Sequence, residues 1–164
     1  GANAAGTAAI PNGQMGLVLD GGTTSNVIGG AASGEGNLIS GNGFAGIWLG
    51  NSTTTGNRIL GNRIGTNAAG TSALDATKQP SGGVYVPNAA GANRIGGTAT
   101  GEGNTIAGNG GPGINVVSGA GVAIRANSIW GNTKLGIDMV MHGCPHQCRD
   151  TIIVLHVNFG TVSQ

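Results

Sequence analysis

The chain has 164 residues, of which 35 are glycine, and its formal net charge is +1. A hydrophobic content of 38% with almost balanced charge argues against a disordered chain, and the absence of a three-residue glycine period excludes a collagen triple helix. There is no run of Lys or Arg and no apolar stretch of about 20 residues, so we expect neither nucleic-acid binding nor a membrane span.

The chain contains an internal repeat, which we follow from its N-terminus. Asn3-Ala-Ala-Gly-Thr7 returns as Asn67-Ala-Ala-Gly-Thr71. The segment from Gly16 to Asn42 matches the segment from Gly83 to Asn109 at a constant offset of 67 residues. Because the first motif belongs to a larger repeat, we expect the chain to begin within a repeat and its first coil to be incomplete.

Two short units make up the long repeat. One is a glycine followed by an alternating apolar triplet, and the other is Asn-x-Ile. From the start of one glycine unit to the start of the next, the chain holds that glycine unit and two further short strands. This spacing predicts three strands per coil. Such short strands bury their apolar side only by stacking on copies of themselves. The glycine units start at Gly16, Gly46, Gly83, Gly113 and Gly136, and the Asn-x-Ile units at Asn26, Asn37, Asn57, Asn62, Asn93, Asn104 and Asn127.

Period-two alternation predicts which side chains point inward. β-branched residues suit stacked, pleated layers, while glycine and asparagine suit tight corners, where stacked asparagines also form amide ladders. The first inward stack comprises Ile47, Leu49, Val84, Val86, Ile114, Val116 and Ile137; the second comprises Ile28, Ile59, Ile95 and Ile124; the third comprises Ile39, Ile64, Ile106 and Ile129.

The pattern G-I-x-V … N-x-I-x-G-N, with the variants N-x-I-G-G and I-G-T-N-A-A-G-T, resembles the repeats of pectin-lyase-like parallel β-helix proteins of bacteria. The resemblance covers residues 1–138 and implies an all-β fold, a right-handed parallel β-helix of about five coils. It also implies an extracellular or cell-surface location. It does not specify an activity, because the same fold carries lyases, hydrolases, epimerases and non-catalytic surface proteins. We expect a non-catalytic structural or carbohydrate-binding module without a cofactor; the alternative is a fragment of a polysaccharide lyase or glycoside hydrolase.

The outward positions of the first strand in each coil are Val18, Trp48, Tyr85, Asn115 and Asp138. Trp48 and Tyr85 are expected on consecutive coils, one above the other, where two exposed aromatic rings with polar tips form a platform for sugar stacking. Two other interpretations are open: the rings stabilise the sheet as a cross-strand pair, or they contact a second subunit or a further domain.

Arginines occupy outward positions of the second strand. Arg58 and Arg94 are expected to be neighbours on adjacent coils with no obvious carboxylate between them, and Arg63 lies on the third strand. A pair of guanidinium groups would suit an acidic polysaccharide. The other interpretation is that they are solvated charges that keep the sheet soluble.

Glu35 and Glu102 occupy equivalent Gly-Glu-Gly-Asn turns and are the candidate catalytic pair. Two coils separate them, about 10 Å by strand spacing, which is close to the carboxylate separation of inverting glycosidases. A structural turn residue would recur in the same way. A third function class, ice binding, would require a regular threonine array, and Thr53, Thr54 and Thr55 do not recur from coil to coil.

The segment 139–164 shares nothing with the repeats. It is expected to be a cap for the solenoid, a strand that pairs with another chain, or non-native sequence. His142, Cys144, His146 and Cys148 are candidate metal ligands; a Cys144–Cys148 disulfide or free thiols are the alternatives. We also expect self-association through open solenoid ends or this C-terminal strand.

Overall fold

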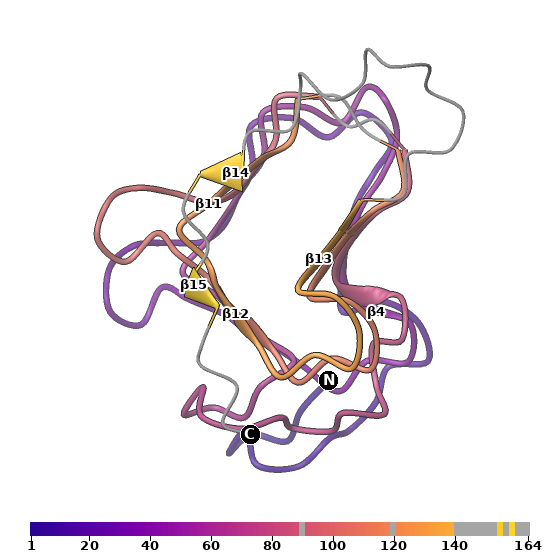
Figure 1. The fold of residues 1–164 in the computed structure, drawn as a ribbon, viewed down its shortest axis with the longest axis vertical. Coiled ribbons are helices and arrows are strands. Elements are labelled where there is room, and N and C mark those ends of the chain that lie inside the picture. The colour runs from indigo at the N-terminus through magenta and orange to yellow at the C-terminus, as the bar shows by residue number, and fades with distance from the viewer. Residues whose placement is uncertain (89–90, 119–120, 140–153, 156–157, 160–164) are drawn as a thin grey trace.

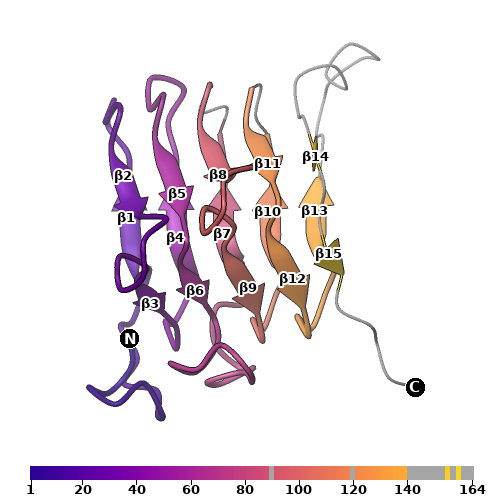
Figure 2. The same cartoon turned by 90° about the vertical axis from the view of Figure 1, so that its left-hand side faces the viewer.

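A computed structural model describes residues 1–88, 91–118, 121–139, 154–155 and 158–159, and within them it contains strands and no helix. The chain winds as a parallel β-helix of about five coils, with three short strands in each coil. Seen along the solenoid axis, successive coils superpose into one outline (Figure 1), and from the side they form a row of parallel rungs (Figure 2). The predicted fold class is therefore confirmed.

Each face of the solenoid is one five-stranded parallel sheet. The first sheet contains β1 (Leu17–Leu19), β4 (Ala45–Leu49), β7 (Gly82–Val86), β10 (Ile114–Val116) and β13 (Ile137–Met139). The second contains β2 (Val27–Gly29), β5 (Arg58–Leu60), β8 (Arg94–Gly96), β11 (Ala123–Arg125) and β14 (Val154–Leu155). The third contains β3 (Leu38–Ile39), β6 (Arg63–Ile64), β9 (Thr105–Ala107), β12 (Ser128–Trp130) and β15 (Asn158–Phe159).

The strand register confirms the three predicted inward stacks. Ile47 pairs with Val84 in the first sheet, Ile59 with Ile95 in the second, and Ile64 with Ile106 in the third. These side chains are fully or almost fully buried and belong to one continuous apolar core. Leu17 and Leu19 of β1 extend the first stack to the first coil.

Buried asparagines form amide ladders along the corners. Asn104 is typical: its Nδ2 donates to Asn127 Oδ1 at 2.8 Å and to the Ile59 carbonyl at 2.8 Å. Its own Oδ1 accepts hydrogen bonds from the backbone N–H and the Nδ2 of Asn62, at 2.9 and 3.1 Å. The ladder thus satisfies backbone groups that the strands leave unpaired at each bend.

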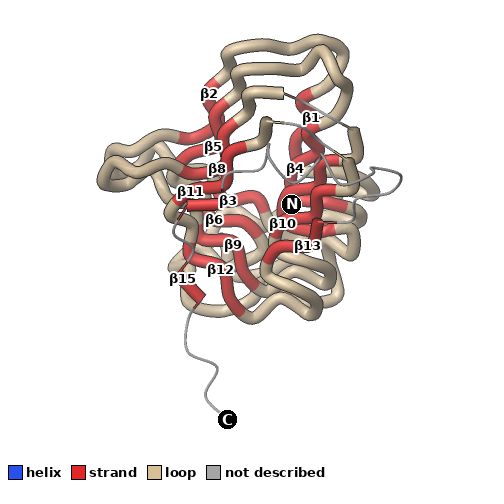
Figure 3. The backbone as a smooth tube through the Cα atoms, turned by 45° about the horizontal axis from the view of Figure 1, so that its top comes forward, coloured by secondary structure: helices blue, strands red, loops and turns tan. Residues whose placement is uncertain are grey.

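Long and short corners alternate, which explains the 67-residue repeat. Between the second and third sheets, loops 30–36 and 97–103 bulge outward, whereas coil 2 turns at Gly61 and Asn62 alone. The two loops protrude together in Figures 1 and 3. Gly61 lies beneath both, since a Cβ there would collide with the Gly30 carbonyl oxygen and come 2.9 Å from that of Gly101. The structural unit is therefore a pair of coils.

The first residues form another such corner. Ala2 bridges Ala9 in an antiparallel hairpin, and Thr66 bridges Ala73 in the same way two coils later. The backbone N–H of Ala68 donates to the Gly6 carbonyl at 2.9 Å, so the two Asn-Ala-Ala-Gly-Thr motifs stack on each other.

The C-terminal segment contributes β14 and β15, which pair in parallel with β11 and β12. Its candidate metal ligands, His142, Cys144, His146 and Cys148, lie outside the described residues. The division at residue 138 and the three interpretations of the tail stay predictions. Among the described residues, no helix is long and apolar enough to cross a membrane.

Candidate functional site

The outer face of the first sheet carries the predicted row of residues in register. Val18 pairs with Trp48, Trp48 with Tyr85, Tyr85 with Asn115, and Asn115 with Asp138. Trp48 and Tyr85 therefore lie on consecutive coils, as the alternation predicts. Both side chains are partly exposed on a face that backbone hydrogen bonds hold rigid.

Three aromatic rings meet on this face, and we call Phe44, Trp48 and Tyr85 the aromatic cluster. The ring centroids of Trp48 and Tyr85 are 5.2 Å apart, and those of Phe44 and Tyr85 are 5.8 Å apart, both edge-on. Phe44 and Trp48 are 6.1 Å apart. These separations are typical of stabilising aromatic pairs, so the cluster also braces the sheet. Sequence reasoning missed Phe44, because it lies in the bend just before β4 and not in the alternating strand itself.

A groove of about 480 Å³ runs beside Trp48, and we call it the aromatic groove. Besides Trp48 it is lined by Asp20, Asn51, Ser52 and Asn88. These polar residues follow the carboxyl ends of β1, β4 and β7, which lie side by side at one edge of the first sheet. Their common position just after neighbouring parallel strands was the sequence signal that could have identified them.

The groove offers both hydrogen-bond donors and hydrogen-bond acceptors. One carboxylate oxygen of Asp20 accepts the Gly21 N–H at 2.7 Å, and Asn51 Oδ1 accepts the hydroxyl of Thr53 at 2.8 Å. The second Asp20 oxygen and the Asn51 Nδ2 have no partner among the described residues. Trp48 Nε1 is buried over Gly50, likewise without a partner in the described part of the chain. A buried indole N–H usually finds an acceptor, but this one has almost no accessible surface, so the groove presents the Trp48 ring and not its N–H to a ligand.

The arginine pair differs from the sequence prediction in one respect. Arg58 and Arg94 are register neighbours on β5 and β8, as predicted. However, Arg94 has a carboxylate partner: its Nη2 lies 2.8 Å from Glu102 Oε1. The expectation of two guanidinium groups without a carboxylate between them was therefore wrong for Arg94. Strand alternation predicted the outward position of Arg94 correctly. It does not predict the path of loop 97–103, which brings Glu102 to Arg94.

Glu35 and Glu102 hold their own loops. Glu35 Oε2 accepts the Ala32 N–H at 2.9 Å, and Glu102 Oε2 accepts the equivalent Ala99 N–H at 3.3 Å. Both loops are closed in the same way by these bonds, which accounts for the recurrence of glutamate in the repeat. The two loops do meet, because a Cβ on Gly101 would collide with the Ala31 carbonyl oxygen.

Other acidic residues are dispersed. Hydrogen bonds from the side chain and the backbone N–H of Thr77 lower the pKa of Asp75, which caps a turn before β7. In the described ranges, no three His, Cys, Asp or Glu side chains gather as a metal site. Threonines also form no regular array there: Thr24 bridges Thr55, but the equivalent position of the next coil is Gly91.

Comparison with protein-family models, with curated proteins and with solved structures finds no match to this chain. The assignment of a parallel β-helix therefore depends on the internal repeat and on the strand register. The chemistry of the site depends on the aromatic cluster and its groove.

Proposed function

We propose that the chain is a non-catalytic carbohydrate-binding module of an extracellular bacterial protein, built on a pectin-lyase-like solenoid. The observation that carries this proposal is the aromatic cluster beside the aromatic groove. The resemblance of the repeats supports the family and the location. The alternative is a fragment of a polysaccharide lyase or glycoside hydrolase. The hydrogen bonds of Glu35 and Glu102 within their own loops do not favour this alternative.

The chemistry of a sugar matches both parts of the surface. A pyranose ring has an apolar face of C–H groups, which packs on an aromatic ring, and an equatorial rim of hydroxyls. Trp48 would supply the apolar contact, while Asp20, Asn51 and Asn88 would bind hydroxyls. Tyr85 does not line the groove; it supports Trp48 from the side at 5.2 Å. The sheet holds the backbone of Trp48, which lowers the ordering cost of this residue on binding.

The proposal predicts binding that depends on Trp48. In a glycan-array screen followed by calorimetric titration of the best ligand, we expect Trp48→Ala to weaken binding at least about tenfold, equivalent to about 1.4 kcal/mol. The double variant Trp48→Ala/Tyr85→Ala should abolish detectable binding, because the supporting ring is lost as well. Tyr85→Phe keeps the ring and should bind within about twofold of the wild type.

Trp130→Ala is the matched control, since Trp130 is the second tryptophan of the chain and is partly exposed on the third sheet. This variant should bind like the wild type. Thermal unfolding of each variant separates lost binding from lost folding. A wild type that binds no glycan, or a Trp48→Ala variant that binds as well as the wild type while folded, would refute the proposal.

A further inference from the structure

A second groove lies on the opposite side of the solenoid outline from β4, and we call it the loop groove. It has a volume of about 280 Å³ and lies where loops 30–36 and 97–103 meet over the tight corner of coil 2. Its lining includes the side chains of Ser33, Arg63 and Thr105, with glycine backbone between them. This volume lies just below the range of drug-sized pockets and suits a small ligand or one chemical group of a larger one.

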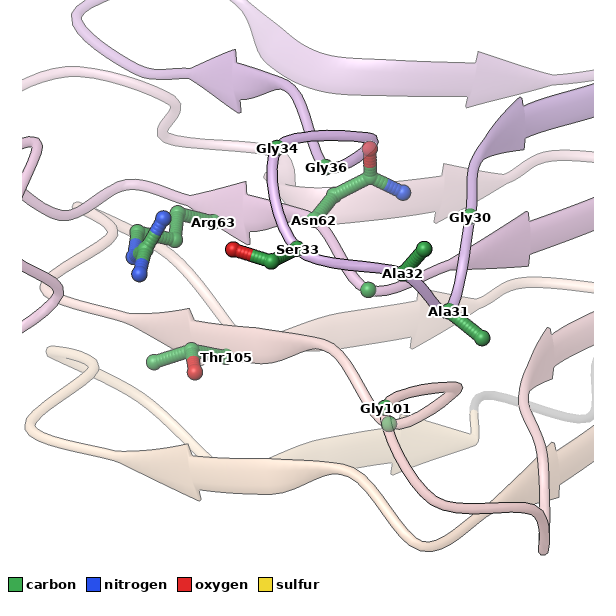
Figure 4. A pocket seen from close by; sticks show the side chains of 12 residues that line it. Gly30, Ala31, Ala32, Ser33, Gly34, Gly36, Asn62, Arg63, Gly101 and Thr105 are labelled. Carbon is green, nitrogen blue, oxygen red and sulfur yellow. The ribbon is translucent and has the colours of Figure 1, made fainter.

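The side chains of the loop groove supply hydrogen-bond donors, and carbonyl oxygens of its backbone, such as those of Gly30 and Gly101, lie near Gly61. Figure 4 shows the Ser33 hydroxyl directed toward Arg63, with Thr105 on the next strand of the third sheet. The Arg63 side chain is exposed and takes part in no salt bridge or hydrogen bond within the described residues. Its side chain packs against Gly70: a Cβ added to this glycine would lie 3.0 Å from Arg63 Nε. The backbone N–H groups of Ser33 and Gly34 have no partner in the same described set.

Among the described residues, no carboxylate side chain lines the groove. Glu35 folds back on its own loop, where its Oε2 accepts the Ala32 N–H at 2.9 Å. Glu102 is bound to Arg94 at 2.8 Å. Arg63 is therefore a positive charge without an internal counter-ion, beside two hydroxyls and free backbone donors. Planar guanidinium donors of this kind bind oxyanions in bidentate geometry.

We propose that the loop groove binds a small oxyanion through the Arg63 guanidinium, assisted by the hydroxyls of Ser33 and Thr105. The shared ligand chemistry is a tetrahedral or planar group with anionic oxygens: free sulfate or phosphate, or the carboxylate of an acidic sugar. Arg63 belongs to β6 in the third sheet, whereas Trp48 belongs to β4 in the first. The loop groove and the aromatic groove are therefore separate, and either proposal can fail without the other.

The test is calorimetric titration of the whole chain with sodium sulfate, sodium phosphate and sodium glucuronate at an ionic strength held constant with chloride. We expect saturable binding of at least one of them. Arg63→Gln should weaken that binding at least about tenfold, because it removes the charge and the paired donors. Arg58→Gln is the matched control: it removes an exposed arginine that does not line the groove, and binding should stay within about twofold.

A second variant, Ser33→Ala/Thr105→Ala, keeps the charge and should weaken binding by an intermediate factor of about three to ten. Binding of sulfate or phosphate assigns the site to a free ion, and binding of glucuronate alone assigns it to an acid group carried by a glycan. The proposal is overturned if the wild type binds none of the three, or if folded Arg63→Gln and Arg58→Gln bind equally well. We expect Arg63→Gln to bind glycans as the wild type does, because Arg63 does not line the aromatic groove.

Discussion

At the scale of single residues, buried amides specify the corners of this solenoid. Asn104 is 1% exposed and connects three coils through hydrogen bonds to Asn62, Ile59 and Asn127. Its amide both donates and accepts, so no apolar side chain of similar size can replace it without leaving backbone groups unpaired. This is why asparagine, a residue that is usually exposed, recurs buried at many of the corners, with Gln79 in the same role at one of them.

Asn104→Ala is expected to lower the free energy of unfolding by about 3 kcal/mol, because the Ile59 carbonyl and the Asn62 N–H lose their partner inside the protein. The matched control is Asn26→Ala, at the exposed start of a ladder, where water replaces the bond to Asn57 Oδ1. It should cost under about 1 kcal/mol. Urea unfolding followed by circular dichroism measures both; equal losses would contradict the assigned role of the ladder.

At the scale of elements, glycine decides where a long corner can start. Gly96 begins loop 97–103 with φ of 78°, a left-handed conformation that side chains disfavour. A Cβ there would also collide with the Arg125 carbonyl oxygen and lie 2.5 Å from Asn127 Oδ1. Gly29 does the same before loop 30–36, with φ of 83°. The two positions explain why both long loops follow an Asn-x-Ile-Gly-Gly motif.

Gly96→Ala should therefore destabilise the solenoid by more than backbone strain alone. Gly34→Ala provides the comparison, since Gly34 has φ of 86° and a Cβ there would meet nothing within 4 Å. We expect about 1–2 kcal/mol for Gly34→Ala, from the left-handed backbone, and at least about 2 kcal/mol more for Gly96→Ala. Thermal unfolding of the two variants compares them directly, and similar losses would show that close packing at Gly96 is unimportant.

At the scale of the whole molecule, the structural unit is two coils. A long corner loop folds over its tight neighbour, as loops 30–36 and 97–103 do over Gly61, so long corners occupy alternate coils. This arrangement creates the loop groove, because two loops of the same sequence pattern approach each other across one tight turn. Within the described residues, the strands of coil 1, β1, β2 and β3, stand at one end of the strand order in the three sheets. Self-association through these edges stays a prediction.

Most of the fold could be predicted from sequence because each coil repeats the same local signals. Alternation around Ile47 and Ile59 fixed the inward stacks, and the spacing of glycine and asparagine units fixed three strands per coil. The positions of the loops were harder to predict from sequence. The salt bridge between Arg94 and Glu102, for example, depends on how loop 97–103 returns over the sheet. The contacts that line the two grooves come from turns of different coils, which periodicity alone does not bring together.

Glycan binding is proposed for the outer face of the first sheet, at Trp48. The most direct measurement uses Trp130→Phe, which leaves Trp48 as the single tryptophan, and follows its fluorescence and its quenching by iodide during titration with the best array ligand. We predict that emission shifts and quenching falls with the same midpoint as calorimetric binding, because the sugar covers the indole ring. A glycan that binds while Trp48 emission and quenching stay unchanged would contradict the claim.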